Sequence, residues 1–254
     1  MTPLDTVGGV PLNSAFPRTV ALIGIDGSGK TTQAHRLAET LAAEGLRASY
    51  RRNAGGRHFV GRIAAWFGRP DAEALVGRRA MLVIESVLRW GALVRTLVRR
   101  AVTGETAVMD RYAYCQYASM RSHHAKPRAE RRARLAYRLF PAPDVTLLLA
   151  VSPRVAQERI ERRGYDREEL SFLEDADTAY RSLPEFPRFV VIDADGSPDE
   201  VAAAIRAALP AAALPRIPHP RASALLSGSR AAVLAFGSLL AGLAALGYQL
   251  LESF

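Results

Sequence analysis

One loop of the sequence reads Gly24-Ile25-Asp26-Gly27-Ser28-Gly29-Lys30-Thr31. It follows an apolar, β-branched run at residues 19–25 and precedes a stretch of helical period that begins at Lys30. In a strand-loop-helix unit of this kind, successive backbone N–H groups and the N-terminus of the helix point at one phosphate. The loop and its context therefore predict a P-loop and the α/β fold that carries such loops.

The side chains of this loop predict ATP and Mg²⁺ as cofactors. Lys30 is expected to neutralise the β- and γ-phosphates of ATP, and the hydroxyl of Thr31 is expected to hold the metal ion. The residues expected to bind the nucleotide are Gly24, Asp26, Gly27, Ser28, Gly29, Lys30, Thr31 and Thr32.

Short apolar runs rich in β-branched residues alternate along the chain with longer stretches of helical period. This alternation is typical of a parallel sheet covered by helices. We expect a P-loop NTPase fold, an α/β architecture with a five-stranded parallel sheet flanked by helices. The expected strands are residues 19–25, 46–52, 106–110, 144–151 and 188–193, and the expected helices are residues 30–44, 71–102, 127–139, 153–163 and 167–182, followed by a last helix that opens at Ser197.

The composition limits the class of protein only in part. A net charge of +9 suits an anionic partner, and a nucleotide, a nucleic acid and an anionic lipid all qualify. Arginine supplies nearly all of the positive charge, since Lys30 and Lys126 are the only lysines. The single cysteine, Cys115, excludes a disulfide framework within the chain and fits a reducing compartment.

The composition divides the chain into four parts. Residues 1–18 form an N-terminal extension without the basic start and apolar core of a signal peptide, and residues 19–209 form the P-loop domain. Residues 210–230 are rich in Pro, Ala, Ser and Arg, as expected of a linker. Residues 231–251 are apolar and uncharged, and at about 1.5 Å per residue they are long enough to cross the hydrocarbon core of a membrane.

Two interpretations of residues 231–251 stay open. In the first, the segment is a transmembrane helix, and Arg216, Arg221 and Arg230 on its N-terminal side place the P-loop domain in the cytoplasm, anchored to the cell membrane. In the second, the segment is a helix buried against the domain or against a partner. Small residues recur within it at four-residue spacing, which would suit a close pair of helices in lipid, so a homodimer is a further expectation.

A second group of polar residues lies at the end of the strand expected at residues 106–110. Asp110 closes this strand and is followed directly by Arg111 and Tyr112. Ligands bind at the C-terminal edge of the sheet in this architecture. Asp110 is therefore expected to hold Mg²⁺ directly or through water, and Arg111 to grip an acceptor phosphate with its planar guanidinium. The alternative is that both residues merely cap the end of a strand.

Two charged segments follow. Residues 159–167 lie between two expected helices and contain Gly164 as a hinge, so we interpret them as a lid whose arginines fold over the transferring phosphoryl group and exclude water. A solvated charged turn is the alternative. Residues 121–138 carry seven basic side chains against one acid, Glu130, which suits an anionic membrane surface but also a solvated helix face.

Four groups of residues carry a resemblance to a known family. They are residues 24–33, Asp110-Arg111-Tyr112, Arg163-Gly164 with Asp166-Arg167, and Phe172 with Tyr180 in the helix after the lid. In these groups the chain resembles the thymidylate kinase family, over most of residues 19–209. The resemblance implies a five-stranded parallel sheet with a P-loop and a mobile lid, and transfer of the γ-phosphate of ATP to a deoxynucleoside monophosphate.

The resemblance also implies roles for single residues. The small residues between Asp26 and Lys30 are similar to the family branch that keeps its catalytic arginine in the lid. By resemblance, Arg52 lies near the acceptor phosphate, Arg89 near the acceptor base, and Asp26 near the acceptor sugar and the metal. The catalytic set is then Lys30, Asp110, Arg162, Arg163 and Arg167, and the acceptor-binding set is Asp26, Arg52, Arg89 and Arg111.

The departures from the family lie on the acceptor side. Glu85 stands where the family has a phenylalanine that stacks on thymine, and Leu88 replaces the acid before the base-reading arginine. The segment from Cys115 departs from the family pattern, and residues 52–56 lack the usual Glu-Pro. We therefore expect a nucleoside monophosphate kinase with a divergent acceptor pocket, acting on thymidylate or another acceptor, without a nucleic-acid partner. A kinase of a small non-nucleotide compound and a membrane-tethered nucleotide-binding scaffold with little turnover are the alternatives.

Overall fold

The structure is a computed structural model, and it describes residues 6–7, 10–11, 17–53, 66, 68, 77–164 and 168–210. The chain forms two compact units. The first comprises Met1–Arg52 and Gly104–Pro215, and the second comprises Asn53–Thr103 and Arg216–Phe254. The first unit contains both the P-loop and Asp110. The contacts between these two parts of the predicted site therefore lie within one unit.

A five-stranded parallel sheet forms the centre of the first unit, as the sequence predicts. Its order is β4 (Ala48–Arg52), β5 (Thr106–Asp110), β3 (Thr19–Ile23), β6 (Val145–Ala150) and β7 (Val190–Asp193). Every residue of β3 and β5 is buried, as expected of central strands that are covered on both faces. A separate antiparallel pair, β1 (Thr6–Val7) and β2 (Val10–Pro11), lies within the expected N-terminal extension.

The register brings several strand ends to one edge of the sheet. Asp110 of β5 pairs with Leu22 of β3 on one side and with Arg52 of β4 on the other. Beyond β3, Ile23 pairs with Leu148 of β6. The loop after β3 and the ends of β4 and β5 therefore meet at the C-terminal edge, where ligands bind in sheets of this kind.

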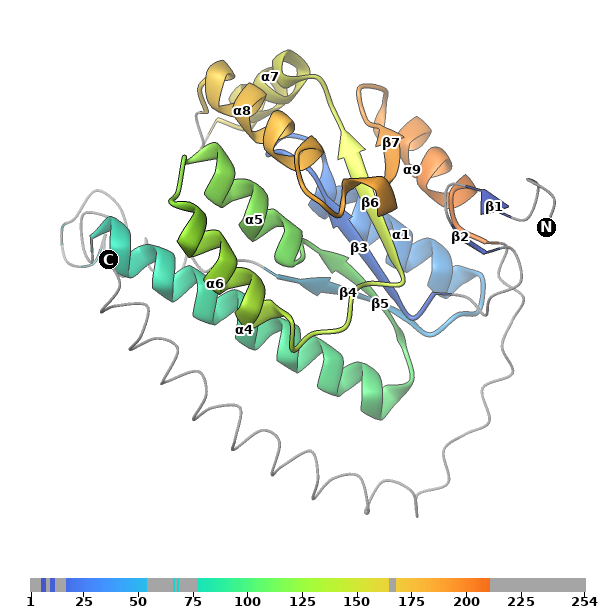
Figure 1. The fold of residues 1–254 in the computed structure, drawn as a ribbon. Coiled ribbons are helices and arrows are strands. Elements are labelled where there is room, and N and C mark those ends of the chain that lie inside the picture. The colour runs from blue at the N-terminus through green and yellow to red at the C-terminus, as the bar shows by residue number, and fades with distance from the viewer. Residues whose placement is uncertain are drawn as a thin grey trace. The chain divides into compact units, whose positions relative to one another are not determined.

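Helices cover both faces of this sheet. Those of the first unit are α1 (Lys30–Ala43), α5 (Ala113–Ser122), α6 (Pro127–Tyr137), α7 (Pro153–Arg163), α8 (Leu170–Arg181) and α9 (Pro198–Ala207), with a short 3₁₀ helix at Phe186–Arg188. Figure 1 shows α5 and α6 in front of the sheet and α1 behind it. α1 packs on β3, β4, β5 and α9, while α5 packs on α6 and α8. The P-loop helix and the helix after Arg111 thus approach the same sheet edge from opposite faces.

The last helix begins where its capping residues predict. The side chain of Ser197 accepts a hydrogen bond from the backbone N–H of Glu200 at 3.4 Å, and Glu200 Oε2 accepts one from the backbone N–H of Ser197 at 2.7 Å. Pro198 occupies the first helical position. These reciprocal bonds satisfy N–H groups that the helix leaves unpaired, which is why the local sequence is sufficient to fix this boundary.

The sequence pattern does not predict α5, and burial explains why. Ala113, Cys115, Gln116, Tyr117 and Ala118 are all buried. A helix that is enclosed on most of its surface shows no alternation of apolar and polar residues at a helical period. The signal that reveals a surface helix is therefore missing here.

The second unit contains α4 (Arg78–Thr103), which covers most of the helix expected at residues 71–102. In the part of the chain that the structure describes, no helix has the length and apolar character needed to span a membrane. The expected linker beyond residue 210 and the expected transmembrane segment at residues 231–251 lie outside the described residues, as does Arg167 of the expected lid.

Candidate phosphotransfer site

The glycine-rich loop has backbone conformations that only glycine adopts easily. Gly24 has a φ of 144° and Gly27 a φ of 83°. A Cβ on Gly24 would lie 2.6 Å from the carbonyl oxygen of Leu149, and a Cβ on Gly27 would lie 2.5 Å from that of Ala156. The loop therefore packs tightly on the end of β6 and on α7, and both positions exclude a side chain.

The helix α1 begins directly after the loop, with Gly29 as its N-cap. Among the described residues, nothing lies within 4 Å of the position that a Cβ on Gly29 would take, so this side of the loop is open. The first backbone N–H groups of α1 have no acceptor within the helix, and the helix dipole favours an anion in front of them. The geometry is that of a phosphate-binding loop.

Lys30 is buried, and its ammonium group is held inside the loop. Nζ donates to the carbonyl oxygen of Ile25 at 2.5 Å, and it lies 3.4 Å from both Ser28 Oγ and Asp26 Oδ1. Burial lowers the pKa of Lys30, and the carboxylate of Asp26 opposes that shift. These contacts hold the Lys30 side chain inside the loop, and its role toward the β- and γ-phosphates stays a prediction.

Asp110 connects the P-loop helix to β4. Its Oδ2 accepts a hydrogen bond from the hydroxyl of Thr31 at 2.7 Å and another from the hydroxyl of Tyr50 at 3.1 Å. Its Oδ1 is buried and finds no hydrogen-bond partner among the described residues. Buried carboxylate oxygens are nearly always bound to a donor, a water or an ion, so this oxygen is available to a ligand. Carboxylate and hydroxyl oxygens suit Mg²⁺. The residues that the sequence predicts for the metal therefore fit it.

Thr31 and Asp110 are the two described residues that fit a magnesium ion at this edge of the sheet. The described residues include no group of three or more His, Cys, Asp or Glu side chains that could hold a metal ion. Mg²⁺ commonly keeps several waters and is held by one or two protein groups together with substrate phosphates. Thr31 and Asp110 match that sparse type of site.

Tyr50 belongs to the site although no sequence pattern predicts it. Besides its bond to Asp110, its ring stacks on His35 of α1, with ring centroids 3.6 Å apart. Burial and the carboxylate of Asp110 raise the pKa of Tyr50, so the phenol keeps its proton and stays a donor. Tyr50 precedes Arg52 by two residues, which places both on one face of β4. The two-residue spacing could have indicated that Tyr50 lies on the same side of the strand as Arg52. Only the strand order shows that Asp110 lies next to Tyr50.

Arg111 and Asp26 form an ion pair beside Lys30. Arg111 has a φ of 76°, and its guanidinium donates to Asp26 Oδ1 at 2.6 Å. Burial alone would raise the pKa of Asp26, but Lys30 and Arg111 outweigh burial and hold that pKa well below its usual range. A positive φ is rare outside glycine and is found at functional sites where the surroundings hold it. The P-loop acid and the arginine expected to grip the acceptor phosphate are thus in direct contact.

A buried polar pair lies close to this ion pair. Tyr180 on α8 and Cys115 on α5 are both buried, and Cys115 acts on the phenol of Tyr180. Burial, followed by Cys115, raises the pKa of Tyr180, and Arg111 and Asp26 also act on it electrostatically. The helix that follows the expected lid therefore places a buried phenol within electrostatic range of Arg111 and Asp26.

The remaining predicted nucleotide and acceptor residues are placed in different ways. Arg52 is exposed at the end of β4, in register with Asp110. Ser28 is buried within the loop, and Thr32 is exposed in the first turn of α1. Arg89 lies on α4, in the second unit. Its role toward the acceptor base stays a prediction.

Two of the predicted lid arginines lie in the last turn of α7. Arg162 and Arg163 are exposed, and Gly164 ends the helix with a φ of 78°. The P-loop contacts α7 where Gly27 lies against Ala156. Arg162 and Arg163 lie about 9 Å further along the axis of the same helix. Their place at the end of a helix anchored on the P-loop fits the predicted lid.

Arg159 differs from them. Its guanidinium donates to the carbonyl oxygens of Ala194, Asp195 and Gly196 at 2.8, 2.9 and 2.9 Å. It therefore anchors the loop between β7 and α9. The interpretation of residues 159–167 as a lid is therefore corrected at its first residue. Arg159 has a structural role, so a lid would begin after it.

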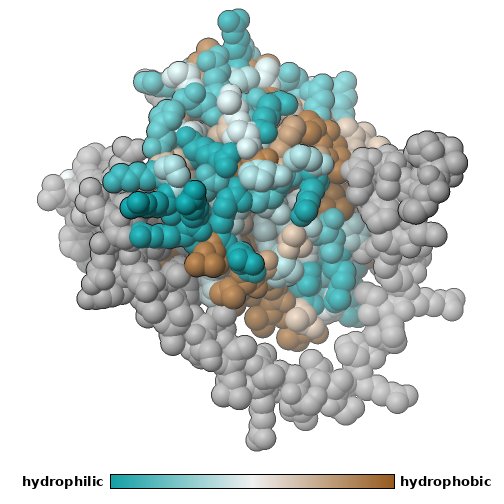
Figure 2. Space-filling model, viewed as in Figure 1, coloured by the Kyte–Doolittle hydropathy of each residue, from teal (hydrophilic) through white to brown (hydrophobic). Residues whose placement is uncertain are grey.

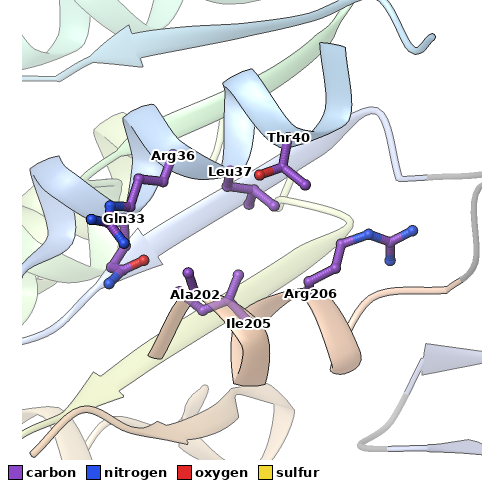
Figure 3. A pocket seen from close by; sticks show the side chains of 7 residues that line it. All are labelled: Gln33, Arg36, Leu37, Thr40, Ala202, Ile205 and Arg206. Atoms are coloured by element: carbon purple, nitrogen blue, oxygen red, sulfur yellow. The ribbon is translucent and has the colours of Figure 1, made fainter. Parts of the chain in front are cut away.

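A groove between α1 and α9 lies apart from this site. It is lined by Gln33, Arg36, Leu37, Thr40, Ala202, Ile205 and Arg206 (Figure 3). Gln33, the last residue of the P-loop match, is buried and donates to the carbonyl oxygen of Pro198 at 2.8 Å. Arg206 pairs with Glu44 at 2.7 Å. Gln33 thus fastens α9 to α1.

The strand order, the P-loop and the Thr31–Asp110 pair together define a P-loop phosphotransferase. Comparisons with known proteins specify it further. The family model described as thymidylate kinase matches residues 23–205. This chain therefore belongs to the thymidylate kinase family, and it is a nucleoside monophosphate kinase that uses ATP.

Individual relatives agree with the family model. A thymidylate kinase from a Synechococcus species is 32% identical over 205 residues, which cover 76% of this chain and 94% of the relative. A thymidylate kinase from a Jannaschia species is 30% identical over 201 residues, covering 75% and 94%. A probable thymidylate kinase from Archaeoglobus fulgidus is 31% identical over 151 residues, covering 57% and 70%. The similarity thus extends over most of the chain.

Proposed function

We propose that this enzyme transfers the γ-phosphoryl group of ATP to thymidylate. The observation that carries the proposal is the contact of Arg111 with Asp26, beside Lys30 and next to the Thr31–Asp110 pair. Groups suited to the donor phosphates and groups suited to an acceptor phosphate share one sheet edge. The choice of thymidylate as the acceptor rests on the relatives, which are named thymidylate kinases.

The chain's own charges suit a phosphoryl transfer. An oxygen of the acceptor phosphate forms a bond to the γ-phosphorus, the bond from that phosphorus to the bridging oxygen breaks, and ADP leaves. Lys30 and Arg111 both pair with Oδ1 of Asp26. Held in this way, they can balance negative charge on donor and acceptor without reorganising. Arg52, at the end of the neighbouring strand, adds a cation for the acceptor phosphate.

Thr31 and Asp110 would hold Mg²⁺, which neutralises phosphate charge when it is bound. Tyr50 orients Asp110 from the side of β4. In the proposed lid, Arg162, Arg163 and Arg167 close over the phosphates, stabilise the charge of the transition state and exclude water.

The test is an ADP-release assay on the full chain with ATP, Mg²⁺ and a panel of nucleoside monophosphates, with Lys30→Ala as the blank. Lys30-dependent turnover that is fastest with thymidylate is expected. Preference for another nucleotide would contradict the proposed acceptor and leave the enzyme class intact. Turnover only with a non-nucleotide compound, or none despite ATP binding, would favour the alternative kinase or the scaffold.

A second proposal concerns localisation. We propose that residues 231–251 anchor the chain in the cell membrane with the catalytic domain in the cytoplasm, because the run is uncharged and follows Arg216, Arg221 and Arg230. We propose a homodimer because small residues recur at four-residue spacing within the run. The expected result is that the full chain stays in the membrane pellet after alkaline extraction and sediments as a dimer in detergent. Release into the supernatant would contradict the anchor, and the mass of one chain would contradict the dimer.

A further inference from the structure

The outer face of α6 carries basic and apolar side chains that have no role in the phosphotransfer site. Residues 128, 132, 135 and 139 follow one another at spacings of four and three, so they share one side of the helix and of the turn after it. Leu135 is 64% exposed and Leu139 is 71% exposed. Arg128, Arg131 and Arg132 are exposed beside them. We call these five residues the arginine–leucine face.

The inner side of α6 is fixed to the first unit. Glu130 pairs with Arg121 of α5 at 2.9 Å and with Arg134 at 2.8 Å, and Arg134 pairs with Glu185. The guanidinium of Arg134 also lies over the ring of Tyr117, 4.3 Å from its centroid. These contacts satisfy the one acid of the helix on its inner side. They leave the helix as a rigid support for whatever its outer face binds.

The outer arginines have no ion-pair partner among the described residues. In the part of the chain that the structure describes, the side chains of Arg128, Arg131 and Arg132 make no ion pair and no hydrogen bond, and Lys126 and Arg138 at the two ends of α6 add exposed charge of the same sign. In Figure 2 the part of the surface where α6 lies shows hydrophilic and hydrophobic side chains next to one another. Positive charge and exposed leucine are therefore combined on one rigid helix.

We propose that the arginine–leucine face docks on an anionic lipid bilayer. A helix with arginines beside exposed apolar side chains binds in the interface plane, where the cations meet lipid phosphates and the apolar side chains enter the acyl boundary. A nucleic acid would satisfy the arginines but would leave Leu135 and Leu139 without an apolar partner. The docking uses residues of the folded first unit and does not depend on the segment at residues 231–251.

The experiment places a reporter on this face in the full chain. Leu139→Cys is labelled with an environment-sensitive fluorophore; the native Cys115 is 3% exposed and is not expected to react in the folded chain. The protein is mixed with vesicles of phosphatidylcholine alone or of phosphatidylcholine with phosphatidylglycerol. A blue shift with the anionic vesicles only, reversed by added salt, is expected.

Matched variants separate this face from net charge. Replacing Arg128, Arg131 and Arg132 by Glu is expected to weaken the response to anionic vesicles by about tenfold or more. Replacing Arg47, Arg154 and Arg188, three exposed arginines elsewhere in the chain, by Glu changes the net charge equally. This variant is expected to leave the response to anionic vesicles unchanged. Leu135→Ser is expected to weaken the response without changing its dependence on salt. Kinase activity in solution checks that each variant is folded.

Three results would overturn the proposal. An equal shift with both kinds of vesicle that the Glu variant leaves unchanged would mean that another segment alone brings the chain to the bilayer. A shift that grows with protein concentration without vesicles would mean that a second copy covers the face. A response to duplex DNA that vesicles do not displace would identify a nucleic-acid surface.

Discussion

The phenol of Tyr50 donates to Oδ2 of Asp110 at 3.1 Å, the oxygen that also accepts the hydroxyl of Thr31. Tyr50→Phe removes this donor but keeps the ring stacked on His35. Because Tyr50 orients an expected metal ligand, we expect the Mg²⁺ concentration needed for half-maximal activity to rise by about tenfold, with little change in Tm. ADP release titrated with Mg²⁺ measures this. Tyr114→Phe on α5 is the matched control, and equal Mg²⁺ dependence in both variants would contradict the role of Tyr50.

Two glycines of the P-loop allow stability and nucleotide binding to be separated. Both Gly27 and Gly29 have φ near 84°, so alanine at either position costs about 1 kcal/mol in backbone strain. Only at Gly27 does the added methyl also meet the backbone of Ala156, and we expect Gly27→Ala to lose about 3 kcal/mol or more. Gly29→Ala is expected to fold well but to bind ATP poorly, because its methyl projects into the open side of the loop.

Urea unfolding and ATP titration of both variants provide the check. Equal losses of stability would show that the packing of the loop on α7 is looser than the distances indicate. Normal ATP binding by Gly29→Ala would place the phosphates elsewhere.

The parts of the site that could be predicted from sequence are those fixed by local chemistry. The P-loop depends on closely spaced glycines between a strand and a helix, and Ser197 with Glu200 form their cap within one turn. Asp110 and Arg111 follow from a simple rule, since a polar pair that ends a buried strand must lie at the sheet edge. Each of these features depends on residues that are close together in the sequence.

The parts that could not be predicted depend on the tertiary structure. Tyr50 reaches Asp110 only because β4 lies next to β5, although sixty residues separate the pair. Arg159 and Arg162 look alike in sequence, but only Arg159 faces the carbonyl groups of the loop before α9. α5 gives no periodic signal because it is buried on several sides. Each miss reflects a contact that sequence spacing does not contain.

The difference between Arg159 and Arg163 can be tested directly. Arg159→Ala leaves three carbonyl groups without their donor, so we expect a loss of about 1–3 kcal/mol in the free energy of unfolding. Arg163→Ala removes an exposed side chain and should change stability by no more than about 0.5 kcal/mol. If Arg163 stabilises the transition state from the lid, its loss lowers kcat by about 100-fold. Thermal unfolding and kcat are measured for both variants. A normal kcat for Arg163→Ala would leave Arg162 and Arg167 as the candidates for the catalytic arginine.

The ion pair of Asp26 with Arg111 predicts a specific dependence of stability on pH. The pKa of Asp26 lies below its ordinary value of 3.8 in the folded chain. A depressed pKa stabilises the folded state above the unfolded-state pKa, and the contribution is lost as the pH falls through the range between the two values. Wild type should therefore exceed Asp26→Asn in free energy of unfolding by a constant amount above about pH 5.5, and the difference should shrink below about pH 4. Urea unfolding across this range measures it, with Asp199→Asn, which removes an exposed ion pair to Arg36, as a control of small effect. A difference that stays the same from neutral to acid pH would mean that Asp26 is not held as a carboxylate between Lys30 and Arg111.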